Sequence, residues 1–154
     1  MSTVRLRART PSAVVVAVAK LARHRLKFYK AGKDGSGKCD IFNTGGANDR
    51  VYGVVFAIEA AEKSDLDIVE GLGADYSEKT VQVTTLEGLE MNVVTYVAIK
   101  IDMQSKPYHW YKNHVLRGAR EHHLPEDYVF EIETVEAIND PIRERHDQEM
   151  RIYY

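Results

Sequence analysis

Residues 67–78 read Asp-Ile-Val-Glu-Gly-Leu-Gly-Ala-Asp-Tyr-Ser-Glu and mark the change from a short apolar helix to a strand. The helical pattern ends at Glu70, and Gly71 and Gly73 then act as a helix stop. Aliphatic residues flank Glu70, and burial among such side chains disfavours the charged form of a carboxyl group. Its pKa then moves toward neutrality, which suits a proton shuttle. Glu70 is therefore the leading catalytic candidate, and a surface glutamate at an ordinary helix end is the alternative.

The composition indicates a single soluble domain. The chain has 154 residues, which suits one domain with one hydrophobic core. It is 44% hydrophobic and 29% charged, as is typical of globular proteins, and its formal net charge is -2. A charge so close to zero argues against broad electrostatic binding to nucleic acid or to an acidic membrane. The expected partners are small molecules or other subunits.

Three further features indicate a cytoplasmic protein. Cys39 is the only cysteine, which excludes an intrachain disulfide and points to a reducing compartment. The longest apolar run, residues 13–19, is too short to span a bilayer. The N-terminus also lacks the charged, apolar and small-residue regions of a secretion signal in their usual order.

The first half of the sequence is predicted to be rich in strands. Residues 13–19 are rich in valine, as in a strand buried on both faces. Residues 25–30 alternate between basic and apolar side chains, which indicates a strand with one wet face. Residues 51–58 are expected to form a central strand, and the glycine-rich residues 31–49 are expected to form a loop.

Two basic or glycine-rich segments are candidates for ligand contact. Arg5, Arg7 and Arg9 lie close together, and either an anion site or a solvated face explains them. Residues 32–38 match the spacing of a phosphate-binding loop, but Cys39 replaces the hydroxyl residue that would bind magnesium, and no helical pattern follows. We therefore expect a mobile or ligand-facing loop here.

The second half is predicted to pass from a helix through a hairpin to two further helices. The predicted elements are a helix over 59–70, strands over 80–85 and 91–101 joined at Glu87-Gly88, a helix from Pro107 to about His122, and another that opens at Pro125. Residues 139–154 form a highly charged C-terminal tail, expected to pack as an arm or to fray. Residues 1–138 are then a single domain.

Five short motifs, in this order and spacing, resemble the gamma-glutamylcyclotransferase family in its avirulence-induced-gene-like branch. They are Arg-Thr-Pro-Ser-Ala at 9–13, Asp-Gly-Ser-Gly-Lys at 34–38, Val-Tyr-Gly-Val-Val-Phe at 51–56, Asp-Ile-Val-Glu-Gly at 67–71 with Tyr76 after it, and Gly-Ala-Arg-Glu-His-His-Leu-Pro-Glu-Asp-Tyr at 118–128. The resemblance implies a mixed α/β (α+β) fold, with a curved or barrel-like mixed β-sheet and flanking helices.

The resemblance also implies an activity and a site. Enzymes of that family convert gamma-glutamyl amino acids or amines into 5-oxoproline and the free amine without a cofactor. The family's glutamate falls on Glu70, which would act as general acid and base. Gly45 and Gly46 are candidates for bringing backbone close to the substrate, with a plain turn as the simpler account. Tyr76 and Tyr128 are candidates for lining the pocket, with a buried structural tyrosine as the alternative for each.

The sequence departs from the family pattern at its beginning. The family opens with a strand that ends in Tyr-Gly-Ser-Asn, and Met1 corresponds to the residue that follows this motif. We expect the loss of substrate-binding backbone donors, each worth about 10²- to 10³-fold in rate. The alternative function is then a non-catalytic small-molecule-binding or interaction protein of the same fold. A sheet edge exposed by the absent strand would also allow a homodimer.

Histidines near the C-terminal half raise the question of a metal site. His122 and His123 adjoin Glu121, but adjacent side chains on a helix point in different directions. His109 and His114 also lack the spacing of two residues on one helical face. We therefore predict no metal, and solvated helix ends account for these histidines; that no cofactor is needed is what the family resemblance implies.

Overall fold

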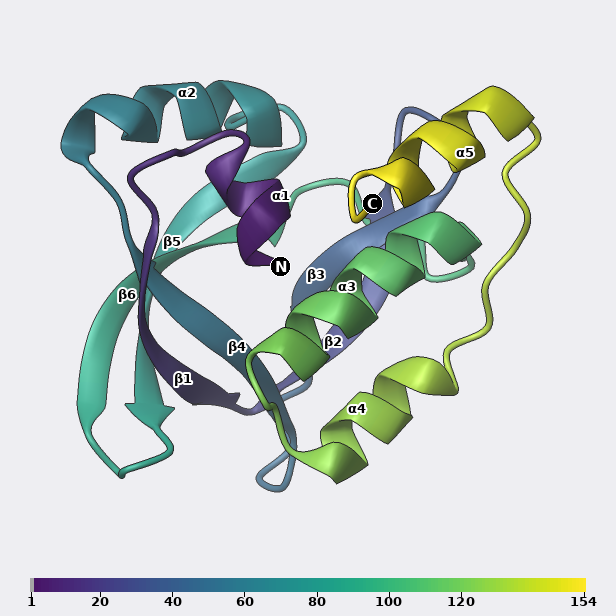
Figure 1. Ribbon diagram of the computed structural model, residues 1–154. Helices are drawn as coiled ribbons and strands as arrows, with labels where there is room; N and C mark the ends of the chain where they lie inside the picture. Colours follow the sequence, from purple (N-terminus) through teal and green to yellow (C-terminus); the bar gives the residue numbers. More distant parts are fainter. Residues whose placement is uncertain (1) are drawn as a thin grey trace.

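The computed structural model describes residues 2–154, so the expectation that concerns Met1 lies outside the described residues. Residues 2–154 fold into five helices and six strands, whose arrangement is drawn in Figure 1. In chain order they are α1 (Thr3–Arg7), β1 (Val14–Ala22), β2 (His24–Ala31), β3 (Gly37–Asn43), β4 (Arg50–Ala57), α2 (Ala60–Glu70), β5 (Tyr76–Thr85), β6 (Glu90–Ala98), α3 (His109–Glu121), α4 (Glu126–Glu133) and α5 (Arg143–Arg151). This confirms the predicted mixed α+β class.

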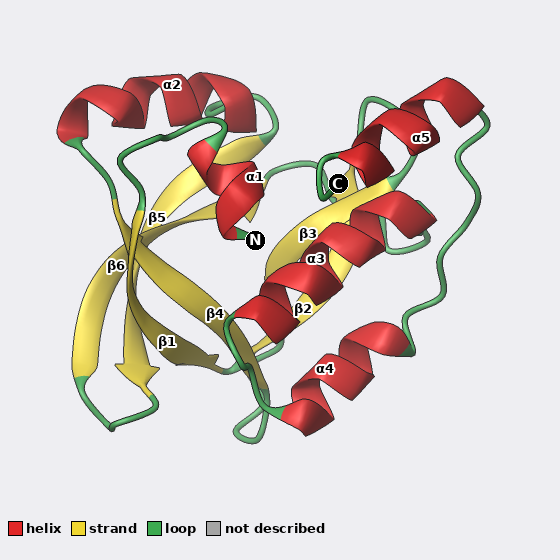
Figure 2. Ribbon diagram, viewed as in Figure 1, coloured by secondary structure: helices red, strands yellow, loops and turns green. Residues whose placement is uncertain are grey.

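The strands form two antiparallel sheets. One sheet has four strands in the order β4-β1-β5-β6, and the other is the β2–β3 hairpin. β5 and β6 pair along their whole length, whereas β1 meets β5 only at Ala19–Thr85 and Lys20–Thr84. Arg23, at a positive φ of 63°, joins β1 to β2 and so turns the chain from one sheet into the other. The strands of the larger sheet are strongly curved, and α2 lies across one end of this sheet (Figure 2).

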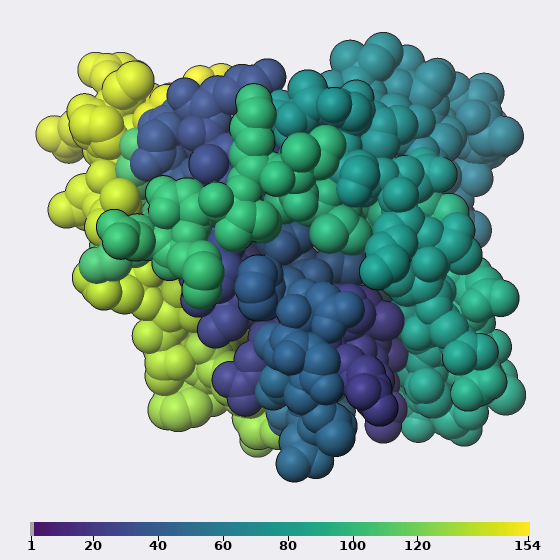
Figure 3. All heavy atoms as spheres, turned by 180° about the vertical axis from the view of Figure 1, so that it is seen from behind, coloured from purple at the N-terminus to yellow at the C-terminus, as the bar shows by residue number. Residues whose placement is uncertain are grey.

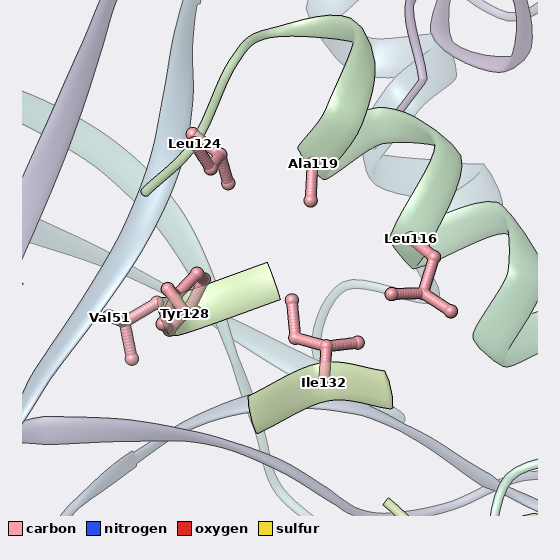
Figure 4. Close-up of a cluster of buried hydrophobic side chains, with 6 residues drawn as sticks. All are labelled: Val51, Leu116, Ala119, Leu124, Tyr128 and Ile132. Carbon is pink, nitrogen blue, oxygen red and sulfur yellow. The ribbon is translucent and has the colours of Figure 1, made fainter. Parts of the chain in front are cut away.

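Two hydrophobic clusters hold the layers together. In the larger one, Val51 of β4 packs against α3 and α4 (Figure 4); its other buried members are Leu116, Ala119, Leu124, Tyr128 and Ile132. The smaller cluster lies within the four-stranded sheet and contains Ala19, Val81 and Val83. The apolar faces of α3 and α4 therefore pack toward the sheet, as the spacing of their apolar residues predicts.

Helix α1 is the point where three parts of the fold meet. The backbone N–H of Thr3 donates to Glu121 at the end of α3 at 3.1 Å. Arg5 pairs with Glu149 of α5 at 3.0 Å. The segment that follows α1 contacts α2, and Figure 1 shows α1 between α2 and the group of α3 and α5. The view from behind in Figure 3 places the C-terminal residues (yellow) and the α2–β6 region (teal) on opposite sides of the molecule.

Several predicted elements are confirmed. The helix expected over residues 59–70 is α2, and the hairpin expected at Glu87-Gly88 joins β5 to β6. Gly88 has a φ of 88°, a left-handed conformation that glycine adopts without strain. The two expected C-terminal helices are α3 and α4, and the alternating segment over 25–30 is part of β2.

Three expectations about the strands are wrong. Residues 14–16 of β1 are exposed rather than buried on both faces, because among residues 2–154 this end of β1 pairs with β4 but not with β5. Within residues 2–154, β4 is an edge strand and not the expected central strand. The prediction failed because an apolar run indicates burial and not the number of neighbouring strands. The loop expected over 31–49 contains β3, so a strand, and not the helix of a phosphate-binding loop, follows Lys38.

The charged tail forms a helix, α5, that polar contacts hold in place. His114 of α3 lies 2.9 Å from the carboxylate of Glu149 and 2.7 Å from the hydroxyl of Tyr153. Arg145 makes two hydrogen bonds to Asp140, each of 2.6 Å. The sequence of α5 has no apolar period that would predict a helix, and no residue of α5 is buried in the structure. None of the described helices has both the length and the apolar character needed to cross a membrane.

Candidate active site

Glu70 is the last residue of α2, and the turn after it requires glycine. Gly71 has a φ of 68° and ends the helix by donating its N–H to the carbonyl of Ile68 at 3.1 Å. A Cβ at Gly71 would lie only 2.7 Å from Oδ2 of Asp75. The glycine thus allows the chain to reverse tightly, and this reversal brings β5 back beside Glu70.

Glu70 is a buried carboxylate beside an arginine. Its side chain is 17% exposed, and Oε1 lies 3.4 Å from the guanidinium of Arg9. Burial raises the pKa of Glu70 above its ordinary value, and the positive charges of Arg9, Arg5 and Lys30 oppose that increase. The group is therefore easier to protonate than an exposed glutamate, as a residue that takes up and returns a proton requires.

This pKa shift predicts how Glu70 affects stability. A carboxyl group whose pKa is higher in the folded than in the unfolded state binds protons more tightly in the folded state. Its contribution to the free energy of unfolding therefore falls as the pH rises from 4.5, the ordinary value, through the raised pKa. We expect Glu70→Gln to be more stable than the original chain at pH 7, and this difference to vanish below about pH 4.5.

Urea unfolding of the two proteins from pH 4 to pH 7 measures this difference. Because all other ionisable groups are shared, the comparison isolates Glu70. A difference in the free energy of unfolding that stays constant with pH would contradict the raised pKa.

Arg9 is held against Glu70 by the segment that links α1 to β1. Thr10 is fully buried, and its hydroxyl donates to the carbonyl of Leu6 at 3.0 Å. Ser12 donates its hydroxyl to Glu62 of α2 at 2.6 Å and accepts the N–H of Glu59 at 2.8 Å. These bonds fix the segment to the first turn of α2, and the ion pair of Arg9 fixes it to the last turn.

Tyr76 and Lys30 lie on the β5 side of Glu70. The hydroxyl of Tyr76 donates to the carbonyl of Cys39 at 3.0 Å, and Nζ of Lys30 lies 5.4 Å from the centre of its ring. Lys30 is buried and pairs with Asp75 at 3.2 Å. Burial raises the pKa of Tyr76, so that its hydroxyl stays a neutral donor. We call Arg9, Lys30, Glu70, Asp75 and Tyr76 the Glu70 cluster.

A cavity of about 910 Å³ opens beside Glu70. The four strands of the larger sheet contribute most of its lining, which is largely aliphatic, and Glu70 and Lys63 of α2 also line it. An apolar cavity with a few polar groups at its margin is the usual form of a small-molecule site. The cavity and the Glu70 cluster together therefore provide a binding space and an adjacent proton acceptor.

The structure brings two of the five predicted site residues together. Tyr76 lies next to the turn after Glu70, and its N–H approaches the carbonyl of Gly71 at 3.4 Å, but it does not line the cavity as predicted. Gly45 and Gly46 lie in the exposed turn after β3 and do not line the cavity. Tyr128 packs in the larger hydrophobic cluster, 5.2 Å between ring centres from Tyr52, and does not line the cavity either.

Three members of the cluster were not predicted as site residues: Asp75, Arg9 and Lys30. The arginine group before Pro11 was a weak signal for Arg9, because spacing alone does not show which of its arginines faces a carboxylate. Lys30 gave no signal, since a lysine in an alternating strand is normally exposed. Both residues reach Glu70 only through the tertiary fold.

Comparison with known proteins identifies related sequences and structures. Residues 50–132 match the AIG2-like family. Over 140 residues the chain is 32% identical to the gamma-glutamylcyclotransferase of Mus musculus and 31% identical to that of Homo sapiens; each alignment covers 87% of this chain and 73% of the relative. A solved gamma-glutamyl cyclotransferase superposes with a TM-score of 0.86 at 26% identity, covering 97% of this chain and 92% of that one.

Proposed function

This chain belongs to the gamma-glutamylcyclotransferase family, and we propose that it releases 5-oxoproline and a free amine or amino acid from a gamma-glutamyl substrate, with Glu70 as general acid and base. The observation that carries this proposal is the half-buried carboxylate of Glu70 at the margin of the cavity, 3.4 Å from Arg9. Its place at a helix end beside a large apolar space suits a proton acceptor that meets a small ligand.

The reaction needs a proton acceptor before any bond to carbon forms. The α-ammonium of the substrate has no free electron pair, so Glu70 first takes one of its protons. The amine nitrogen then attacks the γ-carbonyl carbon and closes a five-membered ring, and the ring nitrogen loses a second proton to water. Glu70 returns its proton to the departing nitrogen as the old C–N bond breaks, and water supplies the proton that converts the released amine to its ammonium form.

Holding the substrate folded supplies much of the rate. The attacking nitrogen and the carbonyl carbon belong to one molecule, so the site has only to select the conformation in which they meet. The buried ammonium of Lys30 adds a positive charge near Glu70 and is itself paired with Asp75. No step of this scheme requires a cofactor or a metal.

The test is the release of 5-oxoproline from a panel of gamma-glutamyl amino acids and amines, measured by chromatography. We expect release from at least one donor, and the preferred donor then identifies the leaving amine. Binding of these compounds without release would favour the alternative, a binding protein of the same fold. If the chain neither binds nor turns over any of these compounds, the proposal is overturned.

We also propose that the protein works in the cytoplasm. Burial raises the pKa of the Cys39 thiol to about 11, which keeps this single cysteine protonated and unreactive. Cell fractionation followed by immunoblotting tests this location.

A homodimer is a further proposal. Among residues 2–154, β4 pairs only with β1 and β6 only with β5, so each presents one unpaired edge. Val94 of β6 is 51% exposed, and it also lines the cavity beside Glu70. Unpaired strand edges favour pairing with another chain. We expect light scattering to report twice the 17.5 kDa chain mass, and Val94→Lys to lower it to the monomer value. A monomeric mass for the original chain would contradict the dimer.

A further inference from the structure

The guanidinium of Arg9 has more hydrogen-bonding capacity than its one contact uses. It carries five N–H donors, and within residues 2–154 its contact is a single one with Glu70 at 3.4 Å. Charge-assisted N–H···O hydrogen bonds are typically about 2.7–2.9 Å long, so the contact between Arg9 and Glu70 is longer than usual. Both side chains are partly open, at 28% and 17% exposure. A ligand can therefore reach the pair and contact both charges.

The neighbouring arginines are occupied elsewhere. Arg5 pairs with Glu149 of α5 at 3.0 Å, and Nε of Arg7 donates to the carbonyl of Ala13 at 3.0 Å. Their contacts hold α1 against the rest of the fold. Only Arg9 of these three forms an ion pair with the carboxylate that lines the cavity.

The reacting end of a gamma-glutamyl compound is itself a pair of opposite charges. Its α-ammonium and α-carboxylate are attached to the same carbon, so the groups that recognise them must be close together and of opposite sign. Arg9 and Glu70 meet both conditions. We propose that Arg9 binds the α-carboxylate of the substrate while Glu70 holds the α-ammonium, an inference that rests on the proposed function.

This arrangement explains how Glu70 can change its charge without leaving Arg9 alone. In the free protein the two side chains neutralise each other at 3.4 Å. When Glu70 takes the ammonium proton it becomes neutral, and the substrate carboxylate then remains as the partner of Arg9. The guanidinium of Arg9 is then free to form charge-assisted hydrogen bonds with that carboxylate. Arg9 therefore selects substrates that carry an α-carboxylate.

The test compares two substrates that differ only in this carboxylate. One is a gamma-glutamyl amide, and the other is the 4-aminobutyryl amide of the same amine, which cyclises to 2-pyrrolidinone. We expect Arg9→Gln to lower kcat/KM for the first by about 10- to 100-fold, the range typical of a lost hydrogen-bonded charge pair, and to leave the second nearly unchanged. Arg9→Lys, which keeps the charge but loses the planar fork, should fall between them.

Arg7→Gln is the matched control. It removes a cation close to Arg9 in the sequence, and any change that it causes in kcat/KM should be the same for both substrates. An equal loss for both substrates in Arg9→Gln would indicate a structural role and overturn the inference, as would an unchanged preference for the gamma-glutamyl compound.

Binding measurements separate this inference from the proposed function. Calorimetric titration with 5-oxoproline and with 2-pyrrolidinone compares the two cyclic products, which differ in the same carboxylate, without turnover. Tighter binding of 5-oxoproline that disappears in Arg9→Gln would support the role of Arg9 even if turnover is absent. If the original chain releases 5-oxoproline but Arg9→Gln binds it equally well, the inference fails and the proposed function stands.

Discussion

Replacing Glu70 by glutamine is expected to lower kcat/KM for 5-oxoproline release by about 10²- to 10⁴-fold, the usual contribution of a positioned acid and base. Glutamine has nearly the same shape as glutamate but cannot take a proton at neutral pH. Among residues 2–154 the polar contact of its carboxylate is the ion pair with Arg9, and this contact is the main one that the replacement weakens. Steady-state assays on the preferred donor measure the effect.

The control for this substitution lies on the same helix. Asp65 of α2 is exposed, and Asp65→Asn removes one negative charge from α2 without touching the Glu70 cluster. We expect Asp65→Asn to retain the original kcat/KM. Equal losses in the two variants would point to a general electrostatic effect, and full activity of Glu70→Gln would exclude Glu70 as the proton acceptor.

Gly71→Ala is expected to lower the free energy of unfolding by about 1–3 kcal/mol and to reduce activity with it. The alanine would adopt a left-handed conformation at a φ of 68°, and its Cβ would lie 2.7 Å from Oδ2 of Asp75. Relief of this clash must move either the turn or Asp75, which pairs with Lys30. Either movement displaces a member of the Glu70 cluster.

Gly73 gives a control with the same backbone conformation. Its φ is 85°, yet no atom lies within 4 Å of the position that a Cβ would occupy. Gly73→Ala therefore introduces left-handed strain without a clash, and it should be the milder change in both urea unfolding and 5-oxoproline release. If Gly73→Ala were as harmful as Gly71→Ala, backbone strain alone would explain both, and the contact with Asp75 would be irrelevant.

The sequence predicted those elements whose signals are local. The end of α2 at Glu70 follows from two glycines, and the β5–β6 hairpin follows from a turn signal between two apolar runs. β3 was missed because Gly37 and Lys38 resemble loop residues, and its strand conformation depends on pairing with β2. The position of β4 at a sheet edge is a property of topology, which an apolar run does not encode.

The candidate site divides in the same way. Glu70 was predicted from its own neighbours in the sequence, and Tyr76 from its place just after them. Arg9 and Lys30 belong to segments that are remote in the chain, and only folding brings them to the cluster. Gly45, Gly46 and Tyr128 lie outside the cavity, because a glycine pair or a tyrosine motif does not show which face of the fold it will occupy.

The contacts of α1 also bear on how the fold is reached. Arg9 pairs with Glu70, whereas Arg5 pairs with Glu149, a residue 144 positions further along the chain. The hydroxyl of Ser2 likewise lies 3.3 Å from that of Tyr153. Contacts between residues so distant in sequence are slow to form. The contacts between α1 and α5 should accordingly be among the later ones to form during folding.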